Sequence, residues 1–279
     1  MGDVWDATTD VLAGRGRVLA PIALIAFLLP FAVQGAIRAY GGPSAGAAAL
    51  GAVVAILVVP LIVWGLFTVV TVASDPAMTR GEAGRLAARR VPAGLLVALV
   101  AFAVVMIATL PIVGVLLASG FDFQAASAQA GSASPAKVAP GAALFCVLYA
   151  LVLALVGLWI GARLFLVNAV VALERRGIGA FARSFALTRG LGWKLIGVNL
   201  LFTLVWGVAA FAARSVTFIV FRLLLGGNGF ATATWFGSLA DAAVTAAFIV
   251  VVGVFAARLH AAVATPATVE PRTASGPWG

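Results

Sequence analysis

The sequence is poor in the residues that most catalytic and metal-binding sites require. It contains one cysteine, one histidine and nine acidic residues among 279 positions. The single cysteine, Cys146, cannot form an internal disulfide, and its apolar surroundings disfavour the reactive thiolate form. His260 has no carboxylate near it in the sequence. We therefore interpret Cys146 as an apolar filler and His260 as a polar residue at a membrane interface.

Charged residues are also scarce, at 10%, whereas 63% of the residues are hydrophobic. The mean hydropathy is +1.16. A soluble domain cannot hide this much apolar surface, because the exterior of a soluble protein is largely polar. Charge-free apolar runs of about 20 residues match the thickness of the hydrocarbon core of a bilayer. The sequence therefore predicts a protein that crosses a membrane several times.

Six such runs predict an all-α bundle of six transmembrane helices. The predicted spans are residues 18–37, 46–73, 91–118, 142–172, 195–214 and 241–263. The stretch 215–225 is open to two interpretations, because it can extend the fifth span or lie along the outer surface. Residues 119–140 and 225–234 are rich in small and turn-forming residues and predict outer loops. We expect 264–279 to be a disordered cytoplasmic tail.

Lysine and arginine are distributed unequally between alternate gaps in this pattern. Thirteen lie on the side of the two termini, and four lie on the opposite side. The positive-inside rule then places both termini in the cytoplasm. Sixteen arginines against two lysines, with abundant Ala, Gly and Val, indicate a GC-rich bacterial genome, so we expect the bacterial inner (plasma) membrane. This topology explains the net charge of +9, and we expect no nucleic-acid partner.

Short basic amphipathic helices are predicted on the cytoplasmic side. In the gap 174–194, the apolar residues share one helical face and Arg176 and Arg183 point away from it. The apolar face comprises Ile178, Phe181, Ala182 and Phe185. Such a helix is expected to lie at the boundary between the lipid headgroups and the acyl chains. The gap 79–90 shows the same pattern more weakly. At the start of the next predicted span lie Trp193 and Lys194, an aromatic residue and a cation of the kind that anchors a span at the interface.

Membrane lipids with anionic headgroups on the cytoplasmic face are therefore the expected partners, and a protein partner within the membrane is not identified. The candidate lipid or anion contacts are Arg163, Arg175, Arg176, Arg183, Arg189 and Lys194. The candidate intramembrane polar contacts are Asn168, Asn199 and Asp241. Arg163 has two open interpretations. It can extend to the inner headgroups, or it can pair with Asp241, Glu174 or a lipid phosphate.

Residues 162–201 read ARLFLVNAVVALERRGIGAFARSFALTRGLGWKLIGVNLL. This stretch resembles the signature region of the bacterial glycerophosphoryl diester phosphodiesterase membrane-domain family. Members show an arginine near the end of a span, an apolar run ending in Glu-Arg, and the pattern A-x-x-R-S-x-x-L-T-R-G-x-x-W. The matching positions are Arg163, Glu174, Arg175, Ala180, Arg183, Ser184, Leu187, Thr188, Arg189, Gly190 and Trp193. The resemblance extends over about 80–196 and departs from the family at Asn168, where Pro or Ala is expected.

In some members of that family, the membrane region is fused to a soluble barrel that hydrolyses phosphodiesters with metal-binding carboxylates and histidine. This sequence offers no segment long enough for the barrel, no metal-ligand spacing and no phosphate-binding loop. The resemblance therefore implies a membrane architecture, and we expect neither enzymatic activity nor a cofactor.

Three function hypotheses remain open. The leading hypothesis is a membrane scaffold or lipid-interacting accessory protein. The alternative is a transporter or channel for a small solute, anions included, with Arg163 and Arg222 as candidate contacts. The third is an intramembrane enzyme whose site is assembled from separate spans. A polar cavity at mid-membrane would favour transport, whereas a closed bundle packed with Leu, Val and Ala would favour the scaffold.

Overall fold

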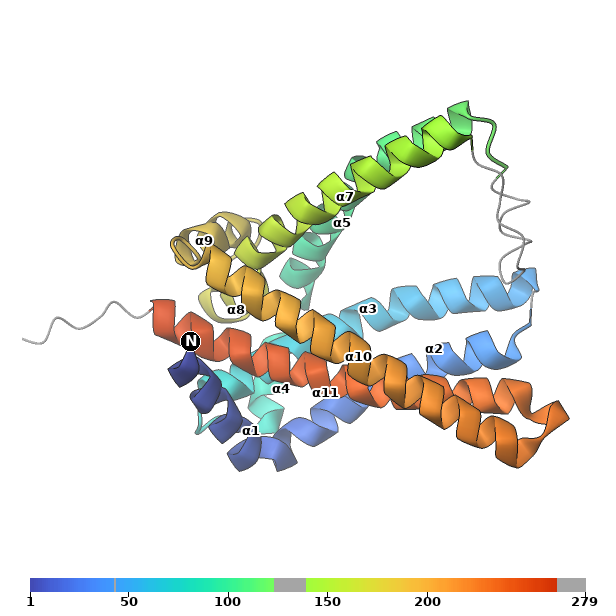
Figure 1. The fold of residues 1–279 in the computed structure, drawn as a ribbon. Coiled ribbons are helices and arrows are strands. Elements are labelled where there is room, and N and C mark those ends of the chain that lie inside the picture. The colour runs from blue at the N-terminus through green and yellow to red at the C-terminus, as the bar shows by residue number, and fades with distance from the viewer. Residues whose placement is uncertain (43, 123–138, 265–279) are drawn as a thin grey trace, which may run out of the picture.

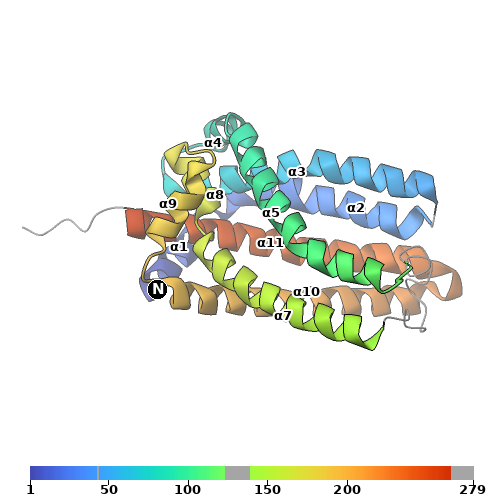
Figure 2. The same ribbon diagram turned by 90° about the horizontal axis from the view of Figure 1, so that it is seen from above.

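The chain forms a bundle of long helices (Figures 1 and 2). The structure, a computed structural model, describes residues 1–42, 44–122 and 139–264. Most of the predicted loop 119–140, and the predicted tail after Ala264, lie outside the described residues. In chain order the elements are α1 (Gly2–Ala23), the π-helical turn η1 (Leu24–Leu28), α2 (Leu29–Tyr40), α3 (Ala45–Ser74), α4 (Arg80–Ala88), α5 (Val91–Ala118), α7 (Pro140–Arg163), α8 (Val167–Glu174), α9 (Gly179–Leu187), α10 (Gly192–Leu225), η2 (Gly227–Gly229) and α11 (Phe230–Ala264).

Six helical segments of the described chain are long and apolar enough to cross a membrane, so the protein is a multi-pass membrane protein. They are Gly2–Tyr40, Ala45–Ser74, Val91–Ala118, Pro140–Glu174, Gly192–Leu225 and Gly227–Ala264. The described residues contain no β-strand, and the predicted all-α, six-span fold is confirmed. Helices α3 and α5 agree with the predicted spans 46–73 and 91–118 to within one residue at each end.

The first helix begins at Gly2, well before the predicted first span. Its N-terminal part packs against α11 and α3 and buries Thr8 and Val11. The chain then turns sharply at η1 before it continues as α2 (Figure 1). The π-helical turn, together with Pro21 and Pro30, accounts for the bend because each interrupts the regular i→i−4 hydrogen bonds.

The connection between α10 and α11 is shorter than the predicted loop 225–234. Helix α10 continues to Leu225, so the ambiguous stretch 215–225 is a continuation of the fifth helix. The turn occupies only 226–229, and its first residue, Gly226, has a φ of 65° that favours glycine. Helix α11 begins at Phe230, so the prediction of a loop was wrong for the second half of that segment.

The predicted fourth span, 142–172, is interrupted. Helix α7 ends at Arg163, and α8 begins at Val167. The backbone N–H of Val167 donates to the carbonyl of Leu164 rather than to that of Arg163. The Arg163 carbonyl instead accepts a hydrogen bond of 2.7 Å from the Ser184 hydroxyl of α9. A side chain from a later helix therefore takes the carbonyl that a continuous helix would need.

Helix α11 is the centre of the bundle and contacts α1, α2, α3 and α10 (Figures 1 and 2). Small residues allow these helices to approach closely. A Cβ atom added at Gly253 of α11 would lie 3.0 Å from a methyl group of Val69 on α3. A Cβ added at Gly35 of α2 would clash with Ser238 of α11. Such contacts between small residues are typical of helix packing in membranes.

Helices α5 and α7, here called the arm, lean away from the other helices (Figure 1). Tyr149 of α7 donates to the carbonyl of Ala108 on α5 and joins the two arm helices. The buried residues of the arm are only Gly94, Val97 and Ala162. We call the end of the bundle that carries α4, α8 and α9 the basic end, and the opposite end, where α10 turns into α11, the hairpin end (Figure 1).

Candidate functional site

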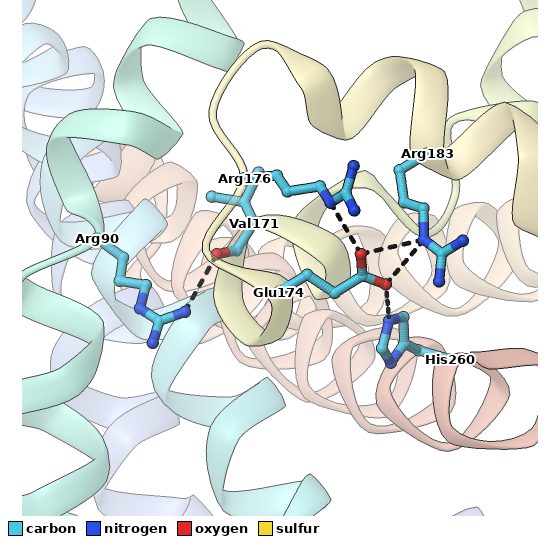
Figure 3. A network of polar contacts seen from close by, with 6 residues as sticks. All are labelled: Arg90, Val171, Glu174, Arg176, Arg183 and His260. Carbon is cyan, nitrogen blue, oxygen red and sulfur yellow. Dashed lines mark hydrogen bonds and ion pairs between the residues drawn. The ribbon is translucent and has the colours of Figure 1, made fainter. Parts of the chain in front are cut away.

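A group of charged side chains at the basic end joins three helices (Figure 3). The carboxylate of Glu174, at the end of α8, accepts hydrogen bonds of 3.1 and 3.0 Å from Nε of Arg183 on α9. The same carboxylate lies 3.1 Å from Nε of Arg176 and 3.0 Å from Nε2 of His260 on α11. The side chains of Glu174 and His260 are only 17% and 10% exposed, so their contact is shielded from water. We call these four residues the polar junction.

The backbone after Glu174 sets the geometry of the polar junction. Arg175 has a left-handed conformation, with a φ of 59°, which ends α8 and turns the chain toward α9. This conformation costs a non-glycine residue about 1 kcal/mol or more. Arg90, just before α5, donates to the carbonyl of Val171 near the end of α8 (Figure 3) and also to that of Ala172. Burial, together with the nearby charge of Arg175, lowers the pKa of Arg90.

Arg163 makes a contact that neither sequence interpretation anticipated. Its guanidinium donates to the carbonyl of Thr188, at the end of α9, with an N–O distance of 3.2 Å. It also lies 5.4 Å from the ring centre of Trp159. The ion pairs found among the described residues do not include Arg163, so the predicted pairing with Asp241 or Glu174 is not formed. Arg163 thus joins α7 to the end of α9.

Arg15 has a similar role that the sequence analysis missed. Its guanidinium donates to the carbonyls of Val72, Asp75 and Met78, at and beyond the end of α3. A cation is favourable there because the last carbonyls of a helix have no intrahelical donors and carry partial negative charge. Arg15, Arg90 and Arg163 therefore each bind the C-terminal end of a different helix.

The remaining predicted lipid contacts lie on the surface of the basic end. Arg175, Arg189 and Lys194 are exposed, and the described hydrogen bonds and ion pairs give their side chains no partner. Trp193 is 85% exposed and Ile178 is 55% exposed. We call these five residues the α9 patch. Arg183 does not belong to it, because Glu174 already binds its guanidinium.

Helix α4 and the residues on either side of it carry acidic as well as basic side chains. Thr79 accepts from the backbone N–H of Glu82, and the Glu82 carboxylate accepts from the N–H and the hydroxyl of Thr79. These hydrogen bonds from Thr79 lower the pKa of Glu82, which therefore stays ionised beside Arg85. The pair forms the capping box that starts α4 at the predicted amphipathic segment 79–90.

A cavity of about 440 Å³ lies between α2, α3, α10 and α11 in the hairpin half of the bundle. Its charged lining residues are Arg38, Arg214 and Asp241. Its uncharged polar lining residues are Gln34, Thr234, Ser238, Thr245 and Trp206. We call it the polar cavity. Asp241 was a predicted intramembrane contact, and the structure places it in the same cavity as two arginines that the sequence analysis had not selected.

A second cavity, of about 290 Å³, lies nearer the middle of the bundle and is mostly apolar. Its lining residues are Leu66, Asn199, Phe202, Thr203, Trp206, Thr245, Phe248, Ile249 and Val252. We call it the apolar cavity. Trp206 donates to the hydroxyl of Thr245 over 3.1 Å, and both residues line both cavities. Asn199 therefore lies in a cavity as well, whereas the predicted contact Asn168 is exposed on α8 and lines neither.

One signal in the sequence could have identified the polar cavity. Thr234, Ser238, Asp241 and Thr245 recur at intervals of three and four residues, which places them on one face of α11. Because residues 225–234 are predicted as a loop, Thr234, the first residue of this pattern, lies outside any predicted helix. The predicted solute contact Arg222 lies outside both cavities, because its guanidinium binds the carbonyls of Gly226 and Gly227.

Within the described ranges, His, Cys, Asp and Glu side chains form no group of three or more that could hold a metal ion. The fold and these sites define a multi-pass, all-α membrane protein with a charged polar junction and a polar cavity. Comparison with known proteins gives no match to a family model, a curated protein or a solved structure. The resemblance of about 80–196 to the glycerophosphoryl diester phosphodiesterase membrane-domain family stays a prediction.

Proposed function

We propose that the protein is a non-enzymatic, lipid-interacting accessory or scaffold protein of the bacterial inner membrane. In this proposal both termini are cytoplasmic, and the basic end contacts anionic headgroups of the inner leaflet. The resemblance to the membrane-domain family, in which this region is separate from the catalytic barrel, supports a role without chemistry.

The observation that carries this proposal is the composition of the α9 patch. Three cations, Arg175, Arg189 and Lys194, are exposed in the segments that flank α9, and the same segments expose Ile178 and Trp193. Acidic residues are absent from the whole stretch 175–240 of the sequence. Cations next to an exposed tryptophan are typical of the membrane–water interface.

The expected strength of this interaction follows from its charge. Each basic residue near an anionic leaflet contributes about 1 kcal/mol, so three contribute about 3 kcal/mol. The attraction should weaken with salt, because mobile ions screen exposed charges over about 10 Å at 0.1 M ionic strength.

The test compares two triple variants with the same change in charge. The first replaces Arg175, Arg189 and Lys194 by glutamine. The matched control replaces Arg80, Arg85 and Arg89, in and just after α4, by glutamine; Asp75 and Glu82 line the same pocket as Arg85 and Arg89. Each protein is placed in nanodiscs of mixed phosphatidylglycerol and phosphatidylcholine, and the bound lipids are measured by native mass spectrometry. We expect the α9-patch variant to lose its enrichment in phosphatidylglycerol, whereas the control retains most of it. Equal enrichment in both variants would contradict the proposal.

Transport of a small anionic solute is a second candidate function, which the polar cavity favours. The contacts would be Arg38 and Arg214 rather than the predicted Arg163 and Arg222, whose guanidiniums bind helix carbonyls. Phosphate or sulfate uptake by proteoliposomes tests this function. Uptake that is lost on Arg214→Gln but kept on Arg222→Gln would support transport, and absence of uptake by the unmodified protein would exclude these two ions.

A further inference from the structure

We infer that the polar cavity and the apolar cavity together bind one membrane lipid whose headgroup carries a single negative charge. The headgroup would lie beside Arg38, Arg214 and Asp241, and an acyl chain would lie in the apolar cavity. This site is separate from the α9 patch and lies in the opposite half of the bundle. It therefore goes beyond the proposed function.

The depth of the charges along the helices supports a lipid headgroup. The helical rise places Lys194 and Arg214 roughly 30 Å apart along α10, and the sequence between them has no charged residue. It places Asp241 and Arg258 roughly 26 Å apart along α11, again with no charge between them. These separations are close to the thickness of the hydrocarbon core, about 30 Å. With Lys194 and Arg258 at one headgroup layer, Arg214 and Asp241 lie near the level of the other, and the hairpin of α10 and α11 continues beyond it.

The charges in the polar cavity are not compensated by one another. The ion pairs of the described residues all involve Glu174 at the basic end, and none joins Asp241 to Arg38 or Arg214. Two arginines and one aspartate leave a net charge of +1 in the polar cavity. A phosphodiester headgroup such as phosphatidylglycerol carries one negative charge, which complements this arrangement. A guanidinium is also well suited to bind phosphate oxygens.

The lining of the two cavities changes from charged to apolar toward the middle of the membrane, as the headgroup and the acyl chain of a lipid require. The charges lie toward the hairpin end, whereas Phe248, Ile249 and Val252 line the apolar cavity closer to the middle of the membrane. Trp206 and Thr245, which line both cavities, mark the boundary between the polar and apolar parts. A small soluble anion would leave the apolar cavity unused.

A lipid can also reach this site from the side. The lining residues of the polar cavity come from α2, α3, α10 and α11, and the arm contributes none. The arm leans away from these helices toward the hairpin end (Figure 1). Val59 of α3 lines the cavity and is 44% exposed, so the rim of the cavity includes an exposed apolar side chain. Such a surface faces acyl chains rather than water.

The test measures binding of short-chain lipids to the full-length, delipidated protein in a nonionic detergent. Dihexanoyl phosphatidylglycerol, dihexanoyl phosphatidylcholine and glycerol 3-phosphate are titrated separately, and the apparent Kd is obtained from the shift in melting temperature. The variants are Arg214→Gln and its matched control, Arg222→Gln, which changes the same residue type on the same helix outside both cavities. Ile249→Trp, which fills the apolar cavity, is the third variant.

We expect phosphatidylglycerol to bind more tightly than phosphatidylcholine, and Arg214→Gln to weaken its binding about tenfold or more, because a charge-assisted contact is lost. Arg222→Gln should bind as the unmodified protein does, and Ile249→Trp should bind more weakly. Should Arg214→Gln fail to fold, Arg38→Gln provides the same test. Glycerol 3-phosphate binding as tightly as the lipid would show a soluble-anion site and overturn the inference. Equal binding of both lipids, or no effect of Arg214→Gln, would also overturn it.

Discussion

Oε1 of Glu174 and Nε2 of His260 lie 3.0 Å apart, although 86 positions separate the two residues in the sequence. Their contact joins the end of α8 to α11, and the hydrogen bonds from Arg183 add α9 to the same carboxylate. Helix α11 is also the helix against which α1, α2, α3 and α10 pack. One carboxylate therefore holds the loop at the basic end against the central helix of the bundle.

Replacing Glu174 by glutamine should lower the stability of the protein by about 2 kcal/mol. The change leaves the guanidinium of Arg183, whose side chain is 35% exposed, and the ring of His260, only 10% exposed, without their charged partner. Thermal unfolding in detergent measures the loss. The matched control is Asp6→Asn, an exposed acid at the other side of the basic end, which should have almost no effect.

The same pair allows a double-mutant cycle. If the contact between Glu174 and His260 stabilises the fold, the effects of Glu174→Gln and His260→Gln should be less than additive in the double variant. Strict additivity would show that the two side chains do not interact in the folded protein.

Much of the fold could be predicted because hydropathy is a local property. The spans α3 and α5 are uninterrupted apolar runs with charges at their ends, and both were predicted almost to the residue. The break after Arg163 could not be predicted, because it depends on the Ser184 hydroxyl from another helix. Residues 230–234 read as a loop from composition, yet they are helical because α11 packs against α10 over its whole first part, as at Gly237 beside Arg214.

Gly94→Ala should weaken the attachment of the arm by about 1–3 kcal/mol. A Cβ at this position would lie 2.5 Å from the ring of Phe67 and 2.7 Å from a methyl group of Val63. Phe67 is only 2% exposed, so a shift of its ring would disturb the surrounding core. The readouts are the melting temperature and the access of a protease to the arm.

Gly114→Ala on the same helix is the matched control, because a Cβ there meets nothing within 4 Å. Alanine is the better helix former, so this variant should be as stable as the unmodified protein or slightly more stable. Equal destabilisation by both variants would mean that the arm does not pack against α3 at Gly94.

The site was harder to predict than the fold, because the sequence identifies residue types but not their partners. Arg163 binds a backbone carbonyl and Arg183 binds Glu174, and nothing in the sequence indicated either partner, whereas their predicted contact with lipid headgroups stays a prediction. His260 was interpreted as an interfacial residue without a carboxylate, and the fold supplies one from α8. Backbone carbonyls at helix ends carry no sequence signal, so the role of Arg15 was not accessible either.

Arg163→Lys should be tolerated better than Arg163→Leu. A lysine ammonium can still donate to the carbonyl of Thr188 and lie near the ring of Trp159, whereas leucine leaves the carbonyl without this donor. We expect a loss of about 1 kcal/mol for lysine and a larger loss for leucine. Membrane abundance and melting temperature measure both. A lysine variant as unstable as the leucine variant would show that the planar guanidinium itself is required.

The orientation of the bundle decides which leaflet each site contacts. Helices α4 and α9 lie at the same end of the bundle as the N-terminus, and the turn after α10 lies at the other end (Figure 1). Because thirteen basic residues lie in the gaps on the side of the termini and four on the other, we expect the basic end to be cytoplasmic.

Reporters fused after truncation at Glu82, Gly179 and Gly227 test this orientation. A fluorescent protein that folds only in the cytoplasm should be bright at the first two positions and dark at Gly227, and alkaline phosphatase should give the opposite pattern. The polar cavity would then face the periplasmic leaflet, and the α9 patch the cytoplasmic one. Phosphatase activity of the Gly179 fusion would place the basic end in the periplasm instead. The α9 patch would then contact anionic lipids of the periplasmic leaflet.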